Sequence, residues 1–175
     1  MAGPILPVRY RMPKPGWLAN EKSPLFVCRT PTHHRFMSEE NKSLIRTFVS
    51  AINAKDWTQL RALLSTDFVR HSTAAGEPGV KSADQLVSFL QAEFVTFPDA
   101  LEVLLDLVAE GDKVAARHEF HGTQLGPMGA LPATGKVLRA SYIAVYRIED
   151  HRIAEAWAEW DNLAGLRQLG HAGAA

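Results

Sequence analysis

His118 is the residue whose type and position most directly favour acid–base chemistry. It lies in the run VAARHEFHG, where alternation along a strand places it on the same side as Val114, Ala116 and Phe120. That side is apolar, so His118 is expected to point into a core or a pocket. A buried neutral histidine can act there as a general base, or it can be a core histidine satisfied by a hydrogen bond.

Two tyrosines and a second histidine could complete such a site. Tyr142 and Tyr146 share one side of a predicted strand with Ala140 and Ala144, and a tyrosine hydroxyl there could donate a hydrogen bond to an oxyanion. The alternative is a tyrosine that packs its ring and exposes its hydroxyl. His71 follows a short predicted strand at the expected mouth of the cavity, where its alternative role is a polar contact to a helix or loop.

The last predicted strand divides its residues into an alanine side and a carboxylate side. One side carries Ala154, Ala156, Ala158 and Trp160, and the other carries Glu155, Trp157, Glu159 and Asp161. The alanine side is expected to face the pocket, with Trp160 in its wall. A one-residue bulge would exchange the two sides and bring Glu159 inward.

The charge and the cysteine content exclude several classes of protein. The formal net charge is zero, which gives no electrostatic case for binding nucleic acid or an anionic membrane, and no apolar run approaches the ~18 residues that span a bilayer. Cys28 is the single cysteine, so no internal disulfide or cysteine metal cluster can form, and a cytoplasmic location fits. No metal is expected, because His33, His34 and His171 have nothing nearby to complete a site.

Residues 1–37 form a segment distinct from the predicted pocket domain, which spans 38–175. Prolines interrupt every helix or long strand that the segment could form, and it carries six basic residues and one acidic residue. It is expected to be a disordered tail or an arm that packs on a partner subunit.

Helices dominate the first half of the domain. Ser38, followed by Glu39 and Glu40, predicts the N-cap and the acidic first turn of a helix. A second helix is capped by Asp56, and a third is predicted over 82–94. A brief strand over 68–71 lies between the second and third helices.

Strands dominate the second half. The pattern of apolar residues and turns predicts strands over 101–109, 114–122, 137–148 and 153–160. Asp161 or Asn162 caps a last short helix that ends at Gly170. This order indicates an α+β fold, with three N-terminal helices packed on a curved, mainly antiparallel sheet.

Four stretches together resemble the SnoaL-like polyketide cyclases, also called ester cyclases. They are NKSLIRTFVSAINAKDWTQLRALLSTDFVRH, LVAEGDKVAARHEFHGT, MGALPATGK and HRIAEAWAEWDNLAGLRQLG, and they cover about 41–170 in the order and spacing of that family. The resemblance implies the cone-shaped α+β barrel shared with ketosteroid isomerase and scytalone dehydratase. It also implies ring closure by an intramolecular aldol step, without a cofactor, in a deep apolar pocket.

The sequence departs from the family where the resemblance places acid–base groups. The catalytic aspartate falls on Ala158, and two histidines fall on Ala156 and Ala144. Any chemistry must therefore come from other residues, and we expect His118, His71 and Tyr142 to be catalytic. The residues expected to bind substrate are Trp160, Tyr146, Phe120, Ala144, Ala156 and Ala158.

The leading interpretation is a cofactor-independent cyclase or isomerase acting on a small apolar polyketide- or terpenoid-like molecule. One alternative is a non-catalytic binding or accessory protein of the same fold. Another is an epoxide hydrolase, which needs an Asp-Arg-Asp cluster, and Arg117 with Glu119, Glu155 or Asp161 is the nearest match. The convex face of such a sheet predicts a homodimer.

Overall fold

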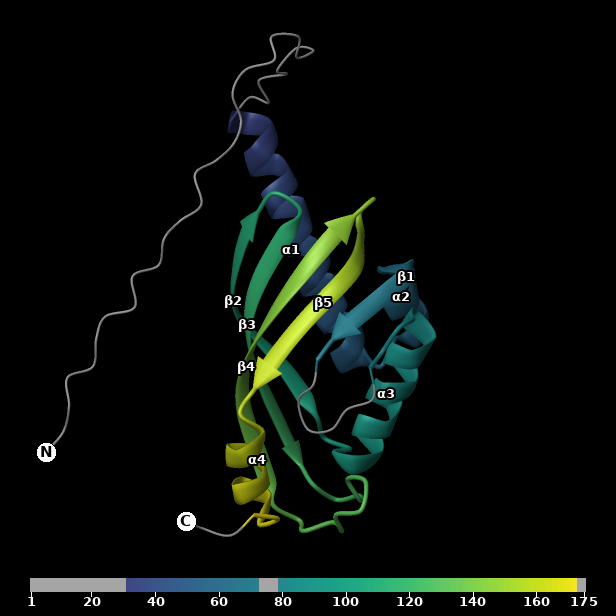
Figure 1. The fold of residues 1–175 in the computed structure, drawn as a ribbon, viewed down its shortest axis with the longest axis vertical. Coiled ribbons are helices and arrows are strands. Elements are labelled where there is room, and N and C mark those ends of the chain that lie inside the picture. The colour runs from purple at the N-terminus through teal and green to yellow at the C-terminus, as the bar shows by residue number, and fades with distance from the viewer. Residues whose placement is uncertain (1–30, 73–78, 173–175) are drawn as a thin grey trace, which may run out of the picture.

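A computed structural model describes residues 31–72 and 79–172 of the chain. Within these residues, helices precede most of the strands (Figure 1). The elements are α1 (Pro31–Ala54), α2 (Trp57–Ala62), β1 (Leu64–His71), α3 (Ala83–Thr96), β2 (Leu101–Glu110), β3 (Lys113–Thr123), β4 (Val137–Glu149), β5 (Arg152–Trp160) and α4 (Asn162–Leu169). None of the described helices is both long enough and apolar enough to cross a bilayer.

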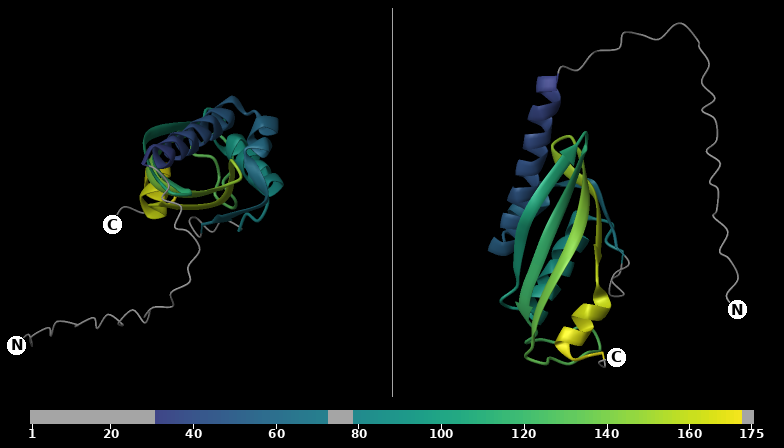
Figure 2. Two further views of the ribbon diagram at one scale, coloured as in Figure 1. Left: turned by 90° about the horizontal axis from the view of Figure 1, so that it is seen from above. Right: turned by 90° about the vertical axis from the view of Figure 1, so that its left-hand side faces the viewer.

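The strands form one five-stranded sheet in the order β1-β5-β4-β3-β2. β1 pairs with β5 in parallel, and the other three pairings are antiparallel. Figure 2 shows the sheet curving around an interior that α1 and α3 cover from one side. The α+β architecture with a curved, mainly antiparallel sheet is therefore confirmed.

Short polar side chains cap three of the described helices, and the caps at Asp56 and Asp161 agree with the prediction from the sequence. The side chains of Asp56, Ser82 and Asp161 accept hydrogen bonds from backbone N–H groups in the first turns of α2, α3 and α4. Gly170 ends α4 in the left-handed conformation, with φ of 80°, which glycine adopts without strain.

The start of the first helix was predicted wrongly. α1 begins at Pro31, so Ser38 lies within the helix instead of capping it. Proline suits the first turn because its missing N–H would have no helical partner there. Residues 1–30 of the expected tail, with Cys28, lie outside the described residues, and the boundary of the domain at residue 38 stays a prediction.

Two apolar clusters fill the space between the helices and the sheet. The larger one joins α1 and α3 to the inner face of the strands, with Ile45, Phe68 and Ile153 almost fully buried. The smaller one contains Phe97, Phe120, Leu138 and Leu169, and it lies toward α4. Each cluster borders a cavity.

Candidate active site

The smaller cavity lies between α1, α3 and the inner face of the sheet, and we call it the inner chamber. Its volume is about 60 Å³. Apolar side chains form most of its wall, including Phe48, Phe68, Leu86, Phe89 and Leu90. The polar side chains that reach it are Arg70, Glu93, Glu102, Tyr142, Tyr146 and Trp160.

Glu102, on β2, places a carboxyl group in this apolar wall. Its side chain is 10% exposed, and the Tyr142 hydroxyl donates a hydrogen bond of 2.9 Å to its Oε2. Burial raises the pKa of Glu102 to about 7, although the Tyr142 hydrogen bond and the charge of Arg70 oppose the rise. Near neutral pH this carboxyl can therefore both accept and release a proton.

His118 lies directly behind these groups. Its ring stacks on Tyr142 with centroids 4.6 Å apart, and its Nε2 is 3.1 Å from the hydroxyl of Tyr146. Its Nδ1 is 3.9 Å from Oε2 of Glu102 and has no hydrogen-bond partner among the described residues. Burial lowers the pKa of His118 to about 4, so the imidazole is neutral at neutral pH.

The two tyrosines remain protonated under ordinary conditions. Burial raises the pKa of Tyr142, and the negative charge of Glu102 raises it further. The same two causes raise the pKa of Tyr146. Both side chains line the inner chamber, and their hydroxyls serve as hydrogen-bond donors instead of as bases.

Glu102 was missed at the sequence level because a bulge decides which way it points. The register of β2 against β3 shifts between Leu104 and Asp106, so Leu105 is the extra residue. Glu102 and Leu104 lie opposite Phe120 and His118, on the inner face. Without the bulge, simple alternation from the inward Leu107 would turn Glu102 outward.

The three alanines at the family's acid–base positions line the inner chamber. Ala144 lies directly opposite Ala158, and Ala156 opposite Tyr146. The register of β5 does shift, but at Ala154, and Glu159 remains exposed. Small side chains at these three positions leave space beside Glu102.

A larger cavity adjoins the inner chamber, and we call it the outer chamber. Its volume is about 470 Å³, and it extends from α3 to α4 over the ends of β3 and β4. Phe120 lines it, and Trp160 lines both chambers. Trp160 meets the ring of Tyr142 edge-on, with centroids 5.7 Å apart.

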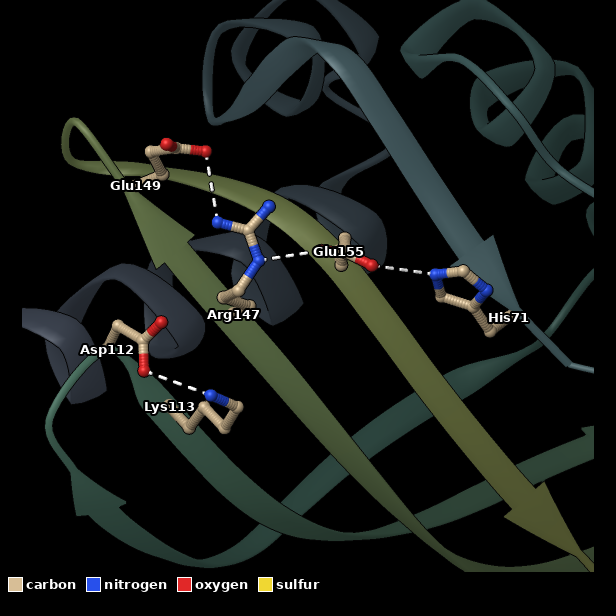
Figure 3. A network of polar contacts seen from close by, with 6 residues as sticks. All are labelled: His71, Asp112, Lys113, Arg147, Glu149 and Glu155. Carbon is tan, nitrogen blue, oxygen red and sulfur yellow. Dashed lines mark hydrogen bonds and ion pairs between the residues drawn. The ribbon is translucent and has the colours of Figure 1, made fainter. Parts of the chain in front are cut away.

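His71 does not join the other candidates, contrary to its expected place at the mouth of the cavity. It lies outside both chambers, where its Nε2 is 2.8 Å from Glu155 and its ring stacks on Trp157. Figure 3 shows Glu155 between His71 and Arg147, which also binds Glu149. The parallel pairing of β1 with β5 explains this position, because it sets His71 opposite Trp157 on the carboxylate side of β5.

The described residues offer no ready place for a metal ion. No group of three or more His, Cys, Asp or Glu side chains in residues 31–72 and 79–172 is arranged to hold one. The site instead combines the buried carboxyl of Glu102 with two phenols and a neutral imidazole, and Arg70 and Glu93 also line it. Such a set can move a proton and stabilise a developing oxyanion.

Comparison with solved structures finds similar proteins over most of the chain. TsrD from Streptomyces laurentii is 30% identical with a TM-score of 0.67, and the match covers 77% of this chain and 97% of that one. IdmH from Streptomyces antibioticus, described as a candidate polyketide cyclase, is 29% identical with a TM-score of 0.65, covering 74% and 98%. AclR from Streptomyces galilaeus, described as a candidate hydroxylase, is 26% identical with a TM-score of 0.69, covering 79% and 85%.

Comparison with curated proteins finds no match. The family model for SnoaL-like polyketide cyclases matches residues 42–169, which is most of the chain and contains every residue of both chambers. The family resemblance seen in the sequence is thereby confirmed: the chain belongs to the SnoaL-like polyketide cyclase family.

Proposed function

We propose that this chain is an enzyme that enolises an apolar carbonyl compound, with Glu102 as the group that moves the proton. The observation that carries the proposal is the Glu102 carboxyl in an apolar cavity, hydrogen-bonded to Tyr142 at 2.9 Å and with its pKa raised to about 7. A cyclase or an isomerase of this family needs such a group. Glu102 supplies the acid–base group that the three alanines lack.

The reaction begins when the ionised Glu102 removes a proton from the carbon next to the substrate carbonyl. The C–H electron pair forms the C=C bond of an enolate, and the carbonyl π electrons move to oxygen. The neutral acid Glu102 then returns the proton to a carbon, which gives an isomer. In a cyclisation, the enolate carbon attacks a second carbonyl and Glu102 protonates the new alkoxide. No oxidant or reductant is required.

Tyr142 and Tyr146 are suited to stabilise the enolate oxygen. Both side chains line the inner chamber and stay protonated. The Tyr142 hydroxyl donates to Glu102 while that carboxyl is ionised, and it can turn to the enolate oxygen once Glu102 has taken up the substrate proton. His118 is a positioning residue in this scheme, because it lies behind the wall and contacts both tyrosine rings. It holds the Tyr146 hydroxyl through Nε2.

The test is exchange of α-protons for deuterium in an apolar ketone, 4-(2-naphthyl)butan-2-one, followed by mass spectrometry in deuterated buffer. The wild-type chain should accelerate exchange, and Glu102→Gln should lower the rate by ~10²-fold or more. Asp106→Asn is the control, since Asp106 is an exposed carboxylate that binds Arg117. Binding of the ketone without exchange would contradict the proposal and favour the non-catalytic binding protein.

Epoxide opening is a second candidate, supported by charged residues that the sequence did not single out. Arg70, Glu93 and Glu102 all line the inner chamber, so a cation and two carboxylates reach one small space. Arg117, the arginine first considered, instead binds Asp106 at an exposed site. Hydrolysis of styrene oxide that is lost in Glu102→Gln, together with no ketone exchange, would favour this activity.

A further inference from the structure

The outer chamber is much larger than the space beside Glu102. At about 470 Å³ it falls in the range of ~300–1,000 Å³ that small-molecule sites occupy, whereas 60 Å³ admits only a few non-hydrogen atoms. A ligand of ordinary size therefore cannot be held in the inner chamber alone. Most of its surface must lie in the outer chamber.

The wall of the outer chamber selects for an uncharged, apolar ligand. Phe97, Phe120, Met128, Leu131 and Leu166 contribute aromatic and aliphatic surface, and no lysine, arginine or histidine is among the described lining residues. Two acidic residues line it, which disfavours an anionic ligand.

Two polar groups of this wall are already engaged, whereas the buried indole N–H of Trp160 has no hydrogen-bond partner among the described residues. Asp161 accepts the capping hydrogen bond of α4 from Ala164, and the Thr96 hydroxyl donates to the carbonyl of Pro127 at 2.8 Å. Such groups offer little new hydrogen bonding to a ligand, so contact with apolar surface must supply most of the affinity.

The two chambers share a wall formed by Phe89, Glu93 and Trp160. Trp160 packs edge-on against Tyr142, whose hydroxyl binds Glu102. A molecule that extends from the outer chamber toward Glu102 therefore passes beside these three side chains. The part that passes must be slender.

We propose that the substrate has two parts: a neutral, bulky apolar body that binds in the outer chamber, and a short carbonyl-bearing end that enters the inner chamber. The role of the carbonyl end rests on the proposed function, but binding of the body does not. Carboxylic acids and compact molecules that lack the slender end are excluded as substrates by this division.

Gly165, in the middle of α4, is a position where a substitution can test whether the ligand binds in the outer chamber. It lines that chamber, and a Cβ added there would lie 3.5 Å from Cδ1 of Leu138, an ordinary contact. Gly165→Leu therefore fills the chamber while replacing a residue that is unfavourable inside a helix. Ala164→Leu is the matched control, because Ala164 adjoins Gly165 on the same helix and does not line the chamber.

The first measurement is binding of the neutral fluorescent probe N-phenyl-1-naphthylamine, which requires no turnover. The Kd should rise at least about tenfold in Gly165→Leu and stay unchanged in Ala164→Leu. Equal binding by wild type and Gly165→Leu would overturn the proposal, as would tight binding of a naphthoate anion.

The second measurement compares two ketones with the same reacting end. In Gly165→Leu, exchange of 4-(2-naphthyl)butan-2-one should fall through a higher KM, while kcat/KM for butan-2-one, which has no body, stays within about twofold. An equal loss for both ketones would overturn the two-part assignment. If the wild type binds the naphthyl probe but exchanges neither ketone, the proposed function fails while the binding site for the body stands.

Discussion

Glu102 and His118 are buried side by side, and burial moves their pKa values in opposite directions. Burial shifts each toward its neutral form, so both are mainly uncharged between about pH 4 and 7, and Glu102 ionises above that range while His118 stays neutral. Two tyrosine hydroxyls face the same space and reinforce this arrangement as donors. When Glu102 accepts a proton, the neighbouring His118 is therefore neutral, and no buried charge remains on this pair.

The Tyr142 hydroxyl should set the pH at which the site becomes active. Its hydrogen bond stabilises the ionised carboxylate and so lowers the pKa of Glu102, which otherwise rises to about 7 through burial. Tyr142→Phe should move the midpoint of the pH–rate profile for ketone exchange to higher pH. Tyr146→Phe is the matched control, because the Tyr146 hydroxyl binds His118. The midpoint of the pH–rate profile of this variant should equal that of the wild type. Equal midpoints in all three proteins would contradict this role.

The shifted pKa values of Glu102 and His118 should also be detectable without substrate, as a dependence of protein stability on pH. The raised pKa of Glu102 gives a contribution to folding that is present below about pH 4.5 and is lost as pH rises through about 7. The lowered pKa of His118 gives one that is present above about pH 6.5 and is lost as pH falls through about 4. Between about pH 4.5 and 6.5 the two dependences are opposite and offset each other.

Substituting either group should reveal the pH dependence of stability that the other group causes. In Glu102→Gln the free energy of unfolding should rise, relative to wild type, by about 1.4 kcal/mol per pH unit across this window. In His118→Phe it should fall by a similar amount. Urea unfolding at several pH values measures both slopes, and variants that follow the wild-type pH dependence would show that these groups titrate normally in the folded chain.

At the scale of elements, the order of helices and strands and the caps of α2 and α4 could be predicted from the sequence, because caps and periodicity are local signals. The site could be predicted only in part. His118, Tyr142 and Tyr146 lie on regular stretches of β3 and β4, whose register is unbroken from Lys113 to Thr123. Simple alternation therefore brings them together correctly.

Glu102 and His71 depend on information that alternation does not contain. The bulge at Leu105 reverses the face of β2, so Leu105 and Val108 become exposed, at 41% and 69%, while Glu102 turns inward. The position of His71 depends on the parallel pairing of β1 with β5, which joins segments far apart in sequence. Both features are set by tertiary pairing, and neither has a local sequence signal.

The loop that closes the outer chamber depends on close backbone contact with α3. The N–H groups of Leu125 and Gly126 both bind the carbonyl of Thr96, and a Cβ at Gly126 would lie 2.3 Å from the carbonyl oxygen of Val95. Gly126→Ala should therefore push the loop away and cost ~1–3 kcal/mol of stability. Gly79→Ala is the control, because nothing lies within 4 Å of its added Cβ. Unchanged unfolding and probe binding in Gly126→Ala would show that the loop does not need this contact.

At the scale of the whole molecule, the helices cover one face of the sheet and leave part of the other face exposed (Figure 2). Ile143 stands there on β4 between Arg117 and Glu159 and is 58% exposed. The ion pair between Arg117 and Asp106 lies beside it. A central apolar residue with a polar surround is typical of a protein interface.

We therefore predict that the chain forms a homodimer through this face, in which a two-fold axis brings the same surface of each copy together. Light scattering should give twice the mass of one chain, and Ile143→Lys should give the mass of one chain, because it buries two charges that lie close together. Val95→Lys is the control, since Val95 is 66% exposed but lies on α3, among the helices. A wild-type chain that scatters as a monomer would contradict the prediction, and so would a dimer lost equally in both variants. Because both chambers lie on the other side of the sheet, Ile143→Lys should keep its affinity for the naphthyl probe, which separates assembly from ligand binding.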